Sequence, residues 1–301
     1  MNAIETVALS KSYRRVQAVR DLNLTIPSGA FYTLMGPNGA GKTTLIKLLM
    51  NLLHPTSGHA NVLGNLAAGL NADQLQNIGY VSENQKLPDW MTAGAFLRYL
   101  RPFYATWDSE LEKQLILRFN LPRKQKLKQL SRGVRMKVAL TTVLAYRPKI
   151  LILDEPLSGL DPLVRDDLVA SILEKSEDTT VLLSSHDLAE IDAFATHVGY
   201  MGGGRLHFSE PIGTLRSRFR KIEINAGLPL APPPTLPAEW LHFSHANSTA
   251  RWVESDYNEA SSIARAQQIF GDVSLTAHPM TLREIFLTMA RSSRVDDPKA
   301  A

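Results

Sequence analysis

The sequence predicts an α/β protein with a mostly parallel β-sheet, followed by a small α+β appendage. Residues 150–153 and 181–183 form two short runs that are apolar on both faces. Such runs are typical of central parallel strands that helices cover on either side. A third apolar run, residues 31–35, leads through a glycine-rich loop into a segment with helical spacing. Strands that alternate with helices in this order indicate an α/β fold.

The first half of the chain is expected to contain a β-rich start, a helix and a helical insert. Apolar and polar residues alternate near residues 4–9 and 22–26, as they do in half-buried strands. After the glycine-rich loop, apolar residues at helical spacing predict an amphipathic helix. These residues are Leu45, Leu48, Leu49 and Leu52. Residues 91–100 and 108–119 also have helical spacing, so we expect a mostly helical insert over about residues 86–146.

The composition changes near residue 215, which we interpret as a boundary between domains 1–215 and 216–301. Residues 228–237 contain five prolines, which predict a stiff connector. Four strands are expected around it, at 221–226, 241–245, 250–254 and 273–277, with helices at 258–270 and 282–291. Three histidines of this part have no metal-ligand spacing, and we expect them at the surface. They are His242, His245 and His278.

Length and composition define the broad class. The 301 residues carry a net charge of +4, with 44% hydrophobic and 21% charged residues, which is the balance of a globular protein. The sequence has no cysteine, which excludes disulfides, thiolate metal sites and a cysteine nucleophile. It also has no apolar signal segment and no apolar run near the about 20 residues of a membrane span, so we expect a soluble, cytosolic chain. The small charge surplus gives no reason to expect nucleic acid binding.

The glycine-rich loop fits the phosphate-binding pattern G-x-x-x-x-G-K-[ST]. The pattern is made by Gly36, Pro37, Asn38, Gly39, Ala40, Gly41, Lys42 and Thr43, with Thr44 following. Glycines allow successive N–H groups to face one concave spot, and the N-terminus of the helix adds its positive end. We expect Lys42 to neutralise phosphate oxygens and the Thr43 hydroxyl to bind Mg²⁺. The alternative, a plain turn, is disfavoured by the strand before the loop and the helix after it.

Two apolar runs end in residues that carry chemistry. Asp154 and Glu155 follow one run and His186 follows the next. Ligands of open α/β sheets bind at the carboxyl ends of parallel strands. Asp154 suits Mg²⁺, and Glu155 suits a general base that polarises the attacking water. Solvated acids and a structural histidine are the alternatives, which the nearby phosphate loop disfavours.

A second candidate site for an anion lies before the helix that contains Val138. Ser131 is suited to be the N-cap of that helix, which is a purely structural role. Its hydroxyl and the free N–H groups of the helix start, including that of Gly133, also suit phosphate.

In this order and spacing, the motifs resemble the nucleotide-binding subunit of an ABC (ATP-binding cassette) transporter, over about residues 4–215. The tail after residue 215 resembles the C-terminal extensions of bacterial subunits of the ABC-2 exporter type, and residues 281–286 look like their closing segment. The resemblance of the motifs has further implications. It implies a P-loop NTPase (RecA-like) fold with a β-rich N-terminal subdomain and a helical insert. It also implies roles for several residues: Tyr13 stacks on adenine, Ser131 and Gly133 form the signature loop, Asp161 lies in the D-loop, and His186 is the switch histidine. The phosphate-binding loop (Walker A) alone would indicate only a P-loop NTPase. The full set of motifs in this order is specific to the ABC family.

Two motifs depart from the family pattern. Arg132 and Val134 replace signature residues, although Ser131 is retained. Glu83 stands where the family has the glutamine of the Q-loop, and Gln85 follows two residues later. Either of these two side chains is a candidate further ligand of Mg²⁺, and the sequence leaves the choice open.

The resemblance implies a subunit that binds ATP and Mg²⁺, hydrolyses ATP to ADP and phosphate, and powers transport, in particular export. Its expected partners are a second nucleotide-binding subunit, in a homodimer, and a separate transmembrane permease that holds the chain at the cytoplasmic face of the membrane. No nucleic acid is expected. The alternatives are a soluble ABC ATPase acting on nucleic acid or the ribosome, and a weakly hydrolysing regulatory subunit. The altered signature and Glu83 are compatible with the last.

The helical insert is where this family docks its membrane partner. Large apolar residues in it could serve that contact, although we expect most of them to form the core of the insert. They are Trp90, Met91, Phe96, Tyr99, Phe103 and Tyr104.

Overall fold

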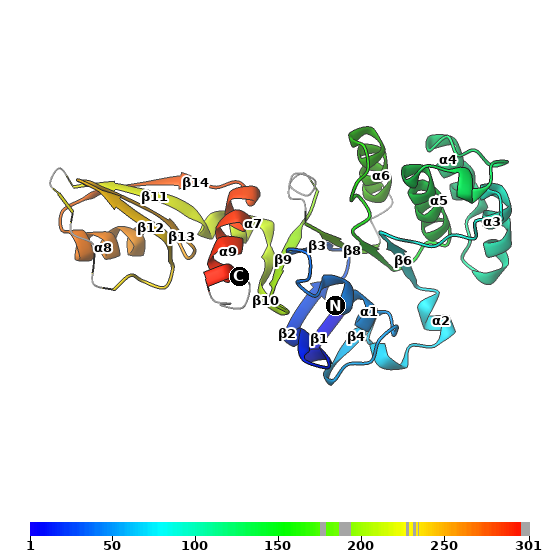
Figure 1. The fold of residues 1–301 in the computed structure, drawn as a ribbon, viewed down its shortest axis with the longest axis horizontal. Coiled ribbons are helices and arrows are strands. Elements are labelled where there is room, and N and C mark those ends of the chain that lie inside the picture. The colour runs from blue at the N-terminus through cyan, green and yellow to red at the C-terminus, as the bar shows by residue number, and fades with distance from the viewer. Residues whose placement is uncertain (175–178, 187–193, 227–228, 231–232, 234, 296–301) are drawn as a thin grey trace. The chain divides into compact units, whose positions relative to one another are not determined.

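The computed structural model describes residues 1–174, 179–186, 194–226, 229–230, 233 and 235–295, which form two compact units (Figure 1). The described part of the first unit is 1–174, 179–186 and 197–209. The second unit contains the described residues of 194–196 and 210–295. The boundary between domains 1–215 and 216–301 stays a prediction. Among the described residues, no helix combines the length and the apolar character that a membrane crossing requires.

The central feature of the first unit is a six-stranded, mostly parallel sheet. Its strands, in spatial order, are β10 (Arg205–Pro211), β9 (His197–Gly202), β3 (Phe31–Met35), β8 (Thr180–Ser185), β7 (Ile150–Asp154) and β6 (Ile78–Ser82). The neighbours from β9 to β6 all pair in parallel. Every residue of β3, β7 and β8 is buried, as the apolar runs predict for central strands. The expected α/β fold with a mostly parallel sheet is confirmed.

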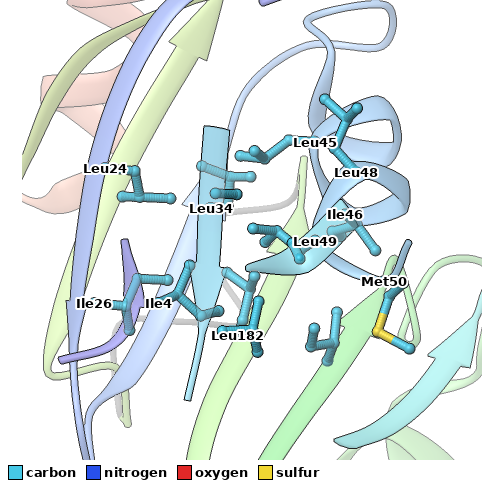
Figure 2. Packing of buried hydrophobic residues seen from close by; sticks show 14 of the residues in the cluster. Ile4, Leu24, Ile26, Leu34, Leu45, Ile46, Leu48, Leu49, Met50 and Leu182 are labelled. Atoms are coloured by element: carbon cyan, nitrogen blue, oxygen red, sulfur yellow. The ribbon is translucent and has the colours of Figure 1, made fainter. Parts of the chain in front are cut away.

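A second, antiparallel sheet makes the start of the chain β-rich, as expected. Its strands, in spatial order, are β2 (Val16–Pro27), β1 (Asn2–Tyr13), β4 (Ser57–Val62) and β5 (Asn65–Leu66). Alternate residues of β2 are buried, including Leu22, Leu24 and Ile26. This sheet and the helix α1 (Lys42–Leu49) contribute to one apolar cluster with the parallel sheet (Figure 2).

The helix α1 is shorter than the spacing of its leucines predicts. Leu45, Leu48 and Leu49 are buried in this apolar cluster, in which Figure 2 labels them. The helix ends at Leu49, so the expectation that Leu52 continues the buried stripe is wrong. Leu52 is 57% exposed, because the chain turns at Asn51, whose φ is +55°. A residue with positive φ cannot continue a right-handed helix.

The middle of the first unit is helical, as expected. Its helices are α2 (Ala72–Leu75), α3 (Ala93–Leu100), α4 (Ser109–Arg118), α5 (Arg132–Ala145) and α6 (Pro162–Glu174), with short 3₁₀ turns at Ala67–Gly69, Arg101–Phe103 and Leu127–Gln129. Side chains of Thr92, Asp108 and Ser131 accept hydrogen bonds from the first turns of α3, α4 and α5. The predicted N-cap role of Ser131 is therefore confirmed.

The expectation that the large apolar residues of the insert form its core is wrong. Trp90, Tyr99 and Phe103 are 74%, 55% and 56% exposed. Met91, Phe96 and Tyr104 are only half-buried. The buried positions of the insert are mostly aliphatic and include Ala93, Leu97, Leu111, Leu115, Phe119, Leu121 and Leu127. Aliphatic side chains from α3 and α4 already fill the interior, so the large rings remain outside it.

The second unit contains an antiparallel sheet with helices. The strands, in spatial order, are β12 (Trp240–Ala246), β13 (Thr249–Glu254), β11 (Arg220–Asn225) and β14 (Ser274–Pro279). The helices are α7 (Ile212–Arg218), α8 (Glu259–Phe270) and α9 (Leu282–Val295). Apart from α7, which is not among the predicted helices, these elements agree with the strands and helices predicted for the tail. Trp240, Trp252 and Ile222 are buried together with Ala266 of α8. The three histidines of the tail are exposed, as expected.

Candidate nucleotide-binding site

The phosphate-loop motif lies between β3 and α1, where the sequence predicts it. Two of its glycines lie against neighbouring backbone. A Cβ on Gly36 would lie 2.3 Å from the carbonyl oxygen of Met201, and a Cβ on Gly41 would lie 2.2 Å from that of Ala18. Gly41 also has φ +104°, a conformation that favours glycine. The loop is therefore a backbone cradle packed against β9 and β2, and neither position has room for a side chain.

Lys42, the first residue of α1, is buried, with 6% of it exposed. Its Nζ donates to the carbonyl oxygens of Gly36 at 2.6 Å and Pro37 at 3.3 Å. It also lies 3.1 Å from Glu155 Oε1. This last contact is an ion pair and not a hydrogen bond: Glu155 Oε1 has no hydrogen-bond partner among the described residues. A buried ammonium group is thus fixed at the mouth of the loop.

Asp154 ends β7 and is buried. Its Oδ1 accepts hydrogen bonds from Thr43 Oγ1 at 3.2 Å and from Ser184 Oγ at 2.7 Å. Ser184 Oγ in turn accepts the backbone N–H of Glu155 at 3.0 Å. The parallel pairing of β7 and β8 sets Asp154 opposite Ser184, which explains this contact. Ser184 was not predicted as a site residue, although its place at the end of an apolar strand beside an aspartate is the signal that could have found it.

Glu155 takes the turn that follows β7 with a φ of +52°. Such a left-handed conformation is costly for a residue with a Cβ and is often found at functional sites. Its Oε2 lies 2.6 Å from Nδ1 of His186, and its other oxygen faces Lys42. The turn therefore points one carboxylate at both groups. His186 is half-exposed, so this end of the site is open to solvent.

Four other predicted residues lie outside this group. Ser131 Oγ accepts the N–H of Val134 at 3.3 Å, and Asp161 Oδ1 accepts the N–H of Val164 at 3.0 Å. A Cβ on Gly133 would lie 3.2 Å from Val164, so the starts of α5 and α6 are in contact. No hydrogen bond or ion pair between described residues joins Ser131 or Asp161 to the phosphate loop. Tyr13 is 43% exposed at the end of β1.

The two candidates for the Q-loop position make different contacts. Glu83 Oε1 accepts a hydrogen bond from Arg132 Nη2 at 3.0 Å. Gln85 Oε1 accepts the N–H of Ser82 at 3.0 Å. Ser82 is the register partner of Asp154 in the parallel pairing of β6 and β7, so both residues follow a strand end beside the buried aspartate. The choice between Glu83 and Gln85 as a metal ligand stays open.

These residues fit a nucleotide with Mg²⁺. The cradle has no room for a Cβ at either glycine, and its backbone N–H groups and Lys42 suit a phosphate chain. The Thr43 hydroxyl and the Asp154 carboxylate meet at 3.2 Å and supply the hard oxygen atoms that Mg²⁺ prefers.

Comparison with known proteins gives the same assignment. Residues 19–158 match the family model described as ABC transporter. The bacitracin transport ATP-binding protein BcrA of Enterococcus faecalis is 31% identical over 72% of this chain and 72% of its own length. An uncharacterised ABC transporter ATP-binding protein of Synechocystis is also 31% identical, over 68% of this chain, and the match spans 62% of that relative.

The fold of the first unit is also found in solved structures. A dimeric ATP-binding cassette in a post-hydrolysis state, bound to ADP and Pi, aligns with a TM-score of 0.60 and 24% identity, over 69% of this chain and 98% of that one. The 31% identity to BcrA over 72% of both chains, together with the family match, shows that this chain belongs to the ATP-binding proteins of ABC transporters.

Proposed function

We propose that this chain binds and hydrolyses ATP and thereby drives transport, in the direction of export, through a separate membrane protein. The observation that carries the proposal is the meeting of Lys42, Asp154, Glu155 and His186 at one edge of the parallel sheet. The bacitracin transport relative supports transport over the alternative of action on nucleic acid or the ribosome.

In the proposed reaction, the phosphate loop and Lys42 bind the phosphate chain of ATP. Phosphate oxygens would compete with Glu155 for the Lys42 ammonium, which now lies 3.1 Å from Oε1. A carboxylate oxygen of Glu155 that is no longer held by the ammonium group would be free to accept a hydrogen bond from water. It would take a proton from water as the water oxygen attacks the terminal phosphorus and the bond to the ADP oxygen breaks.

The other residues of the site orient these groups. His186, 2.6 Å from Glu155 Oε2, would hold the carboxylate toward the water. Thr43 and Asp154, with Glu83 or Gln85 as a further candidate, would hold Mg²⁺. When bound, Mg²⁺ supplies positive charge that stabilises the phosphate oxygens during transfer. Tyr13 would stack on the adenine, as the family resemblance implies.

We further propose that a second copy of the chain completes the site. Ser131, Gly133 and Asp161 belong to the starts of α5 and α6, and no hydrogen bond or ion pair of the described residues links Ser131 or Asp161 to the phosphate loop. A helix start with a serine hydroxyl suits the terminal phosphate of a nucleotide held by a partner. The dimeric cassette with the same fold supports this arrangement.

For the permease, we propose a docking surface on the helical insert. A hollow of about 370 Å³ borders the insert, and its lining includes Phe96 and Leu100 of the insert with Leu52 and Leu75 from before it. The rings of Tyr99 and Phe103 are exposed and 5.4 Å apart, and Trp90 is 74% exposed. Exposed apolar surface of this kind is typical of protein contacts. Such docking would hold the chain at the cytoplasmic face of the membrane.

The hydrolysis proposal is tested with Glu155→Gln. We expect turnover to fall at least 100-fold, while the variant keeps ATP and accumulates as an ATP-dependent dimer in size-exclusion chromatography. Glu174→Gln, which changes an exposed carboxylate paired with Arg118, is the matched control and should keep wild-type turnover. A wild type that binds ATP without hydrolysis would support the regulatory alternative. Turnover per molecule that does not change on dilution to a monomer would contradict the dimer.

The docking proposal is tested with Trp90→Ala. We expect weaker co-purification with the membrane subunit and unchanged ATP affinity. Leu117→Ala is the control, because Leu117 is also exposed, to 80%, but lies on α4, which contributes none of the residues of the proposed surface. An equal loss of ATP binding and co-purification in Trp90→Ala would contradict a docking role.

A further inference from the structure

Two of the residues that depart from the family pattern, Arg132 and Glu83, are in contact with each other. Arg132 Nη2 donates to Glu83 Oε1 at 3.0 Å, across 49 residues of sequence. Glu83 follows β6 and Arg132 is the first residue of α5. The segment between the two residues contains α3 and α4, so the ion pair joins the two ends of that segment. The family pattern has a neutral residue at each of these two positions. Here the two residues carry opposite charges, and they form an ion pair with each other.

The same guanidinium lies against a third loop. A Cβ on Gly159 would lie 3.0 Å from Arg132 Nη1, and Gly159 has φ +66°. Gly159 precedes Leu160 and Asp161 in the loop that leads to α6. Arg132 therefore contacts the segment after β6 and the segment before α6, and it is itself part of the segment that starts α5.

These contacts connect the signature loop to the nucleotide residues within one chain. Ser82, next to Glu83, is the register partner of Asp154, and Asp154 accepts the hydrogen bond from Thr43. Ser131, next to Arg132, is the N-cap of α5. A shift of the segment after β6 would therefore move the Glu83 carboxylate, which pairs with Arg132 at the start of α5.

We propose that Arg132 is a positioning residue, which acts through Glu83 to set where Ser131 and the start of α5 are presented to the nucleotide of a second copy. This inference rests on the proposed function. Both side chains are partly exposed, 46% for Arg132 and 36% for Glu83. An ion pair of this exposure adds little to the stability of the fold. Its effect is on the populations of loop positions, so it should alter turnover and not ATP affinity.

The test is a charge exchange with Glu83→Arg, Arg132→Glu and the double variant. We expect each single reversal to lower kcat about tenfold, since it places like charges opposite each other, while Arg132→Glu changes ATP affinity less than twofold. The double variant should recover to within about threefold of wild type, because it restores an ion pair with the opposite polarity. A double variant no better than the poorer single variant would overturn the proposal.

A matched control lies on the next turn of α5. Arg135 Nη1 lies 3.0 Å from Asp89 Oδ1, which is the same separation as in the first pair. Arg135→Glu should change kcat less than twofold. An equal tenfold loss there would show that any charge reversal on α5 is harmful and would overturn the specific role of Arg132.

A second readout does not depend on hydrolysis. Hydrogen exchange of residues 83–86 and 158–160 should be faster in Arg132→Gln than in the wild type, in the absence of nucleotide. A wild type without ATPase activity together with faster exchange would reject the proposed function but support the positioning contact. Unchanged exchange in both segments would overturn the contact, whatever the activity.

Discussion

The two units of the chain bury polar groups in different ways. In the first unit, Lys42, Asp154 and Glu155 have little exposure and lie at one edge of a parallel sheet. Their partners come from distant parts of the chain: Thr43 and Asp154 are 111 residues apart. In the second unit, the buried Glu254 accepts a hydrogen bond from Ser262, only eight residues later.

Strand direction explains this difference. Parallel strands need crossover connections, so their carboxyl ends, from distant segments, collect at one edge of the sheet. The antiparallel strands β11 and β13 of the second unit run in opposite directions, and their ends alternate between the two edges. A parallel sheet therefore concentrates chemistry at one place, whereas the antiparallel sheet of the second unit mainly supports an apolar core.

That core is aromatic. The rings of Trp240 and Trp252 stack with centroids 4.0 Å apart, and Phe243 and Phe270 lie around them. Stacked rings stabilise a small unit by their area and by their mutual orientation. The comparison thus predicts that substitutions in the first unit alter nucleotide chemistry, and that substitutions in the second unit alter stability.

The largest expected effect is that of Gly41→Ala. The new Cβ would lie 2.2 Å from the carbonyl oxygen of Ala18, and φ of +104° disfavours alanine. The loop must therefore deform, and we expect ATP affinity to fall more than 100-fold in a titration with a fluorescent ATP analogue. Gly69→Ala is the control, since a Cβ there meets nothing within 4 Å. Retained affinity in Gly41→Ala would show that the shape of the cradle is not required.

The next effect is that of Trp252→Ala in the second unit. Removal of a buried ring typically costs about 3–5 kcal/mol of stability. We expect a loss of this size in the urea-induced unfolding of the second unit, followed by circular dichroism, with ATP affinity unchanged. Leu287→Ala, at a position 45% exposed, should change little. A large loss of ATP affinity in Trp252→Ala would contradict the separation of roles between the units.

These expectations also show which features the sequence predicts well. Apolar runs such as 150–153 predict central strands because burial on both faces requires apolar residues throughout. The strand ends then bring Asp154 to the phosphate loop, since parallel strands share an edge. The helices of the tail were predictable because their spacing and caps are local, as with Asn258 at the start of α8.

Other features depend on contacts that periodicity cannot describe. Leu52 has the right spacing for a buried helix face, but a turn at Asn51 ends the helix before it. Trp90 is apolar yet exposed, because burial depends on what packs against a residue and not only on its type. The pairing of Glu83 with Arg132 joins segments 49 residues apart, which no local pattern indicates.

A smaller effect is expected from Glu254→Gln. Burial raises the pKa of the Glu254 carboxyl above its ordinary value of 4.5. Its protonated form is therefore favoured in the folded state, and stability is lost as the pH rises from 4.5 through the raised pKa. At pH 7 the neutral glutamine should stabilise the second unit by about 1 kcal/mol, since a charge no longer has to be buried. The gain should disappear near pH 4, measured as the urea midpoint. A gain independent of pH would contradict this explanation.

The smallest expected effect is that of Glu284→Gln, which has the opposite dependence on pH. Glu284 accepts the N–H of Thr281 at 2.9 Å and pairs with Lys221, in a capping box at the start of α9. The bond with Lys221 is the main cause that lowers the pKa of Glu284 from 4.5 to about 2. Its stabilisation is therefore present above pH 4.5 and is lost as the pH falls toward 2.

Because Glu284 and Lys221 are both partly exposed, solvent weakens their attraction, and we expect Glu284→Gln to cost only about 0.5 kcal/mol at pH 7. The difference from wild type should shrink on acidification, and also in about 1 M salt, which screens exposed charges. Glu254→Gln should not respond to salt in this way, because its effect comes from burial. If both variants showed the same pH and salt dependence, titration of the second unit would reflect its net charge and not these two separate environments.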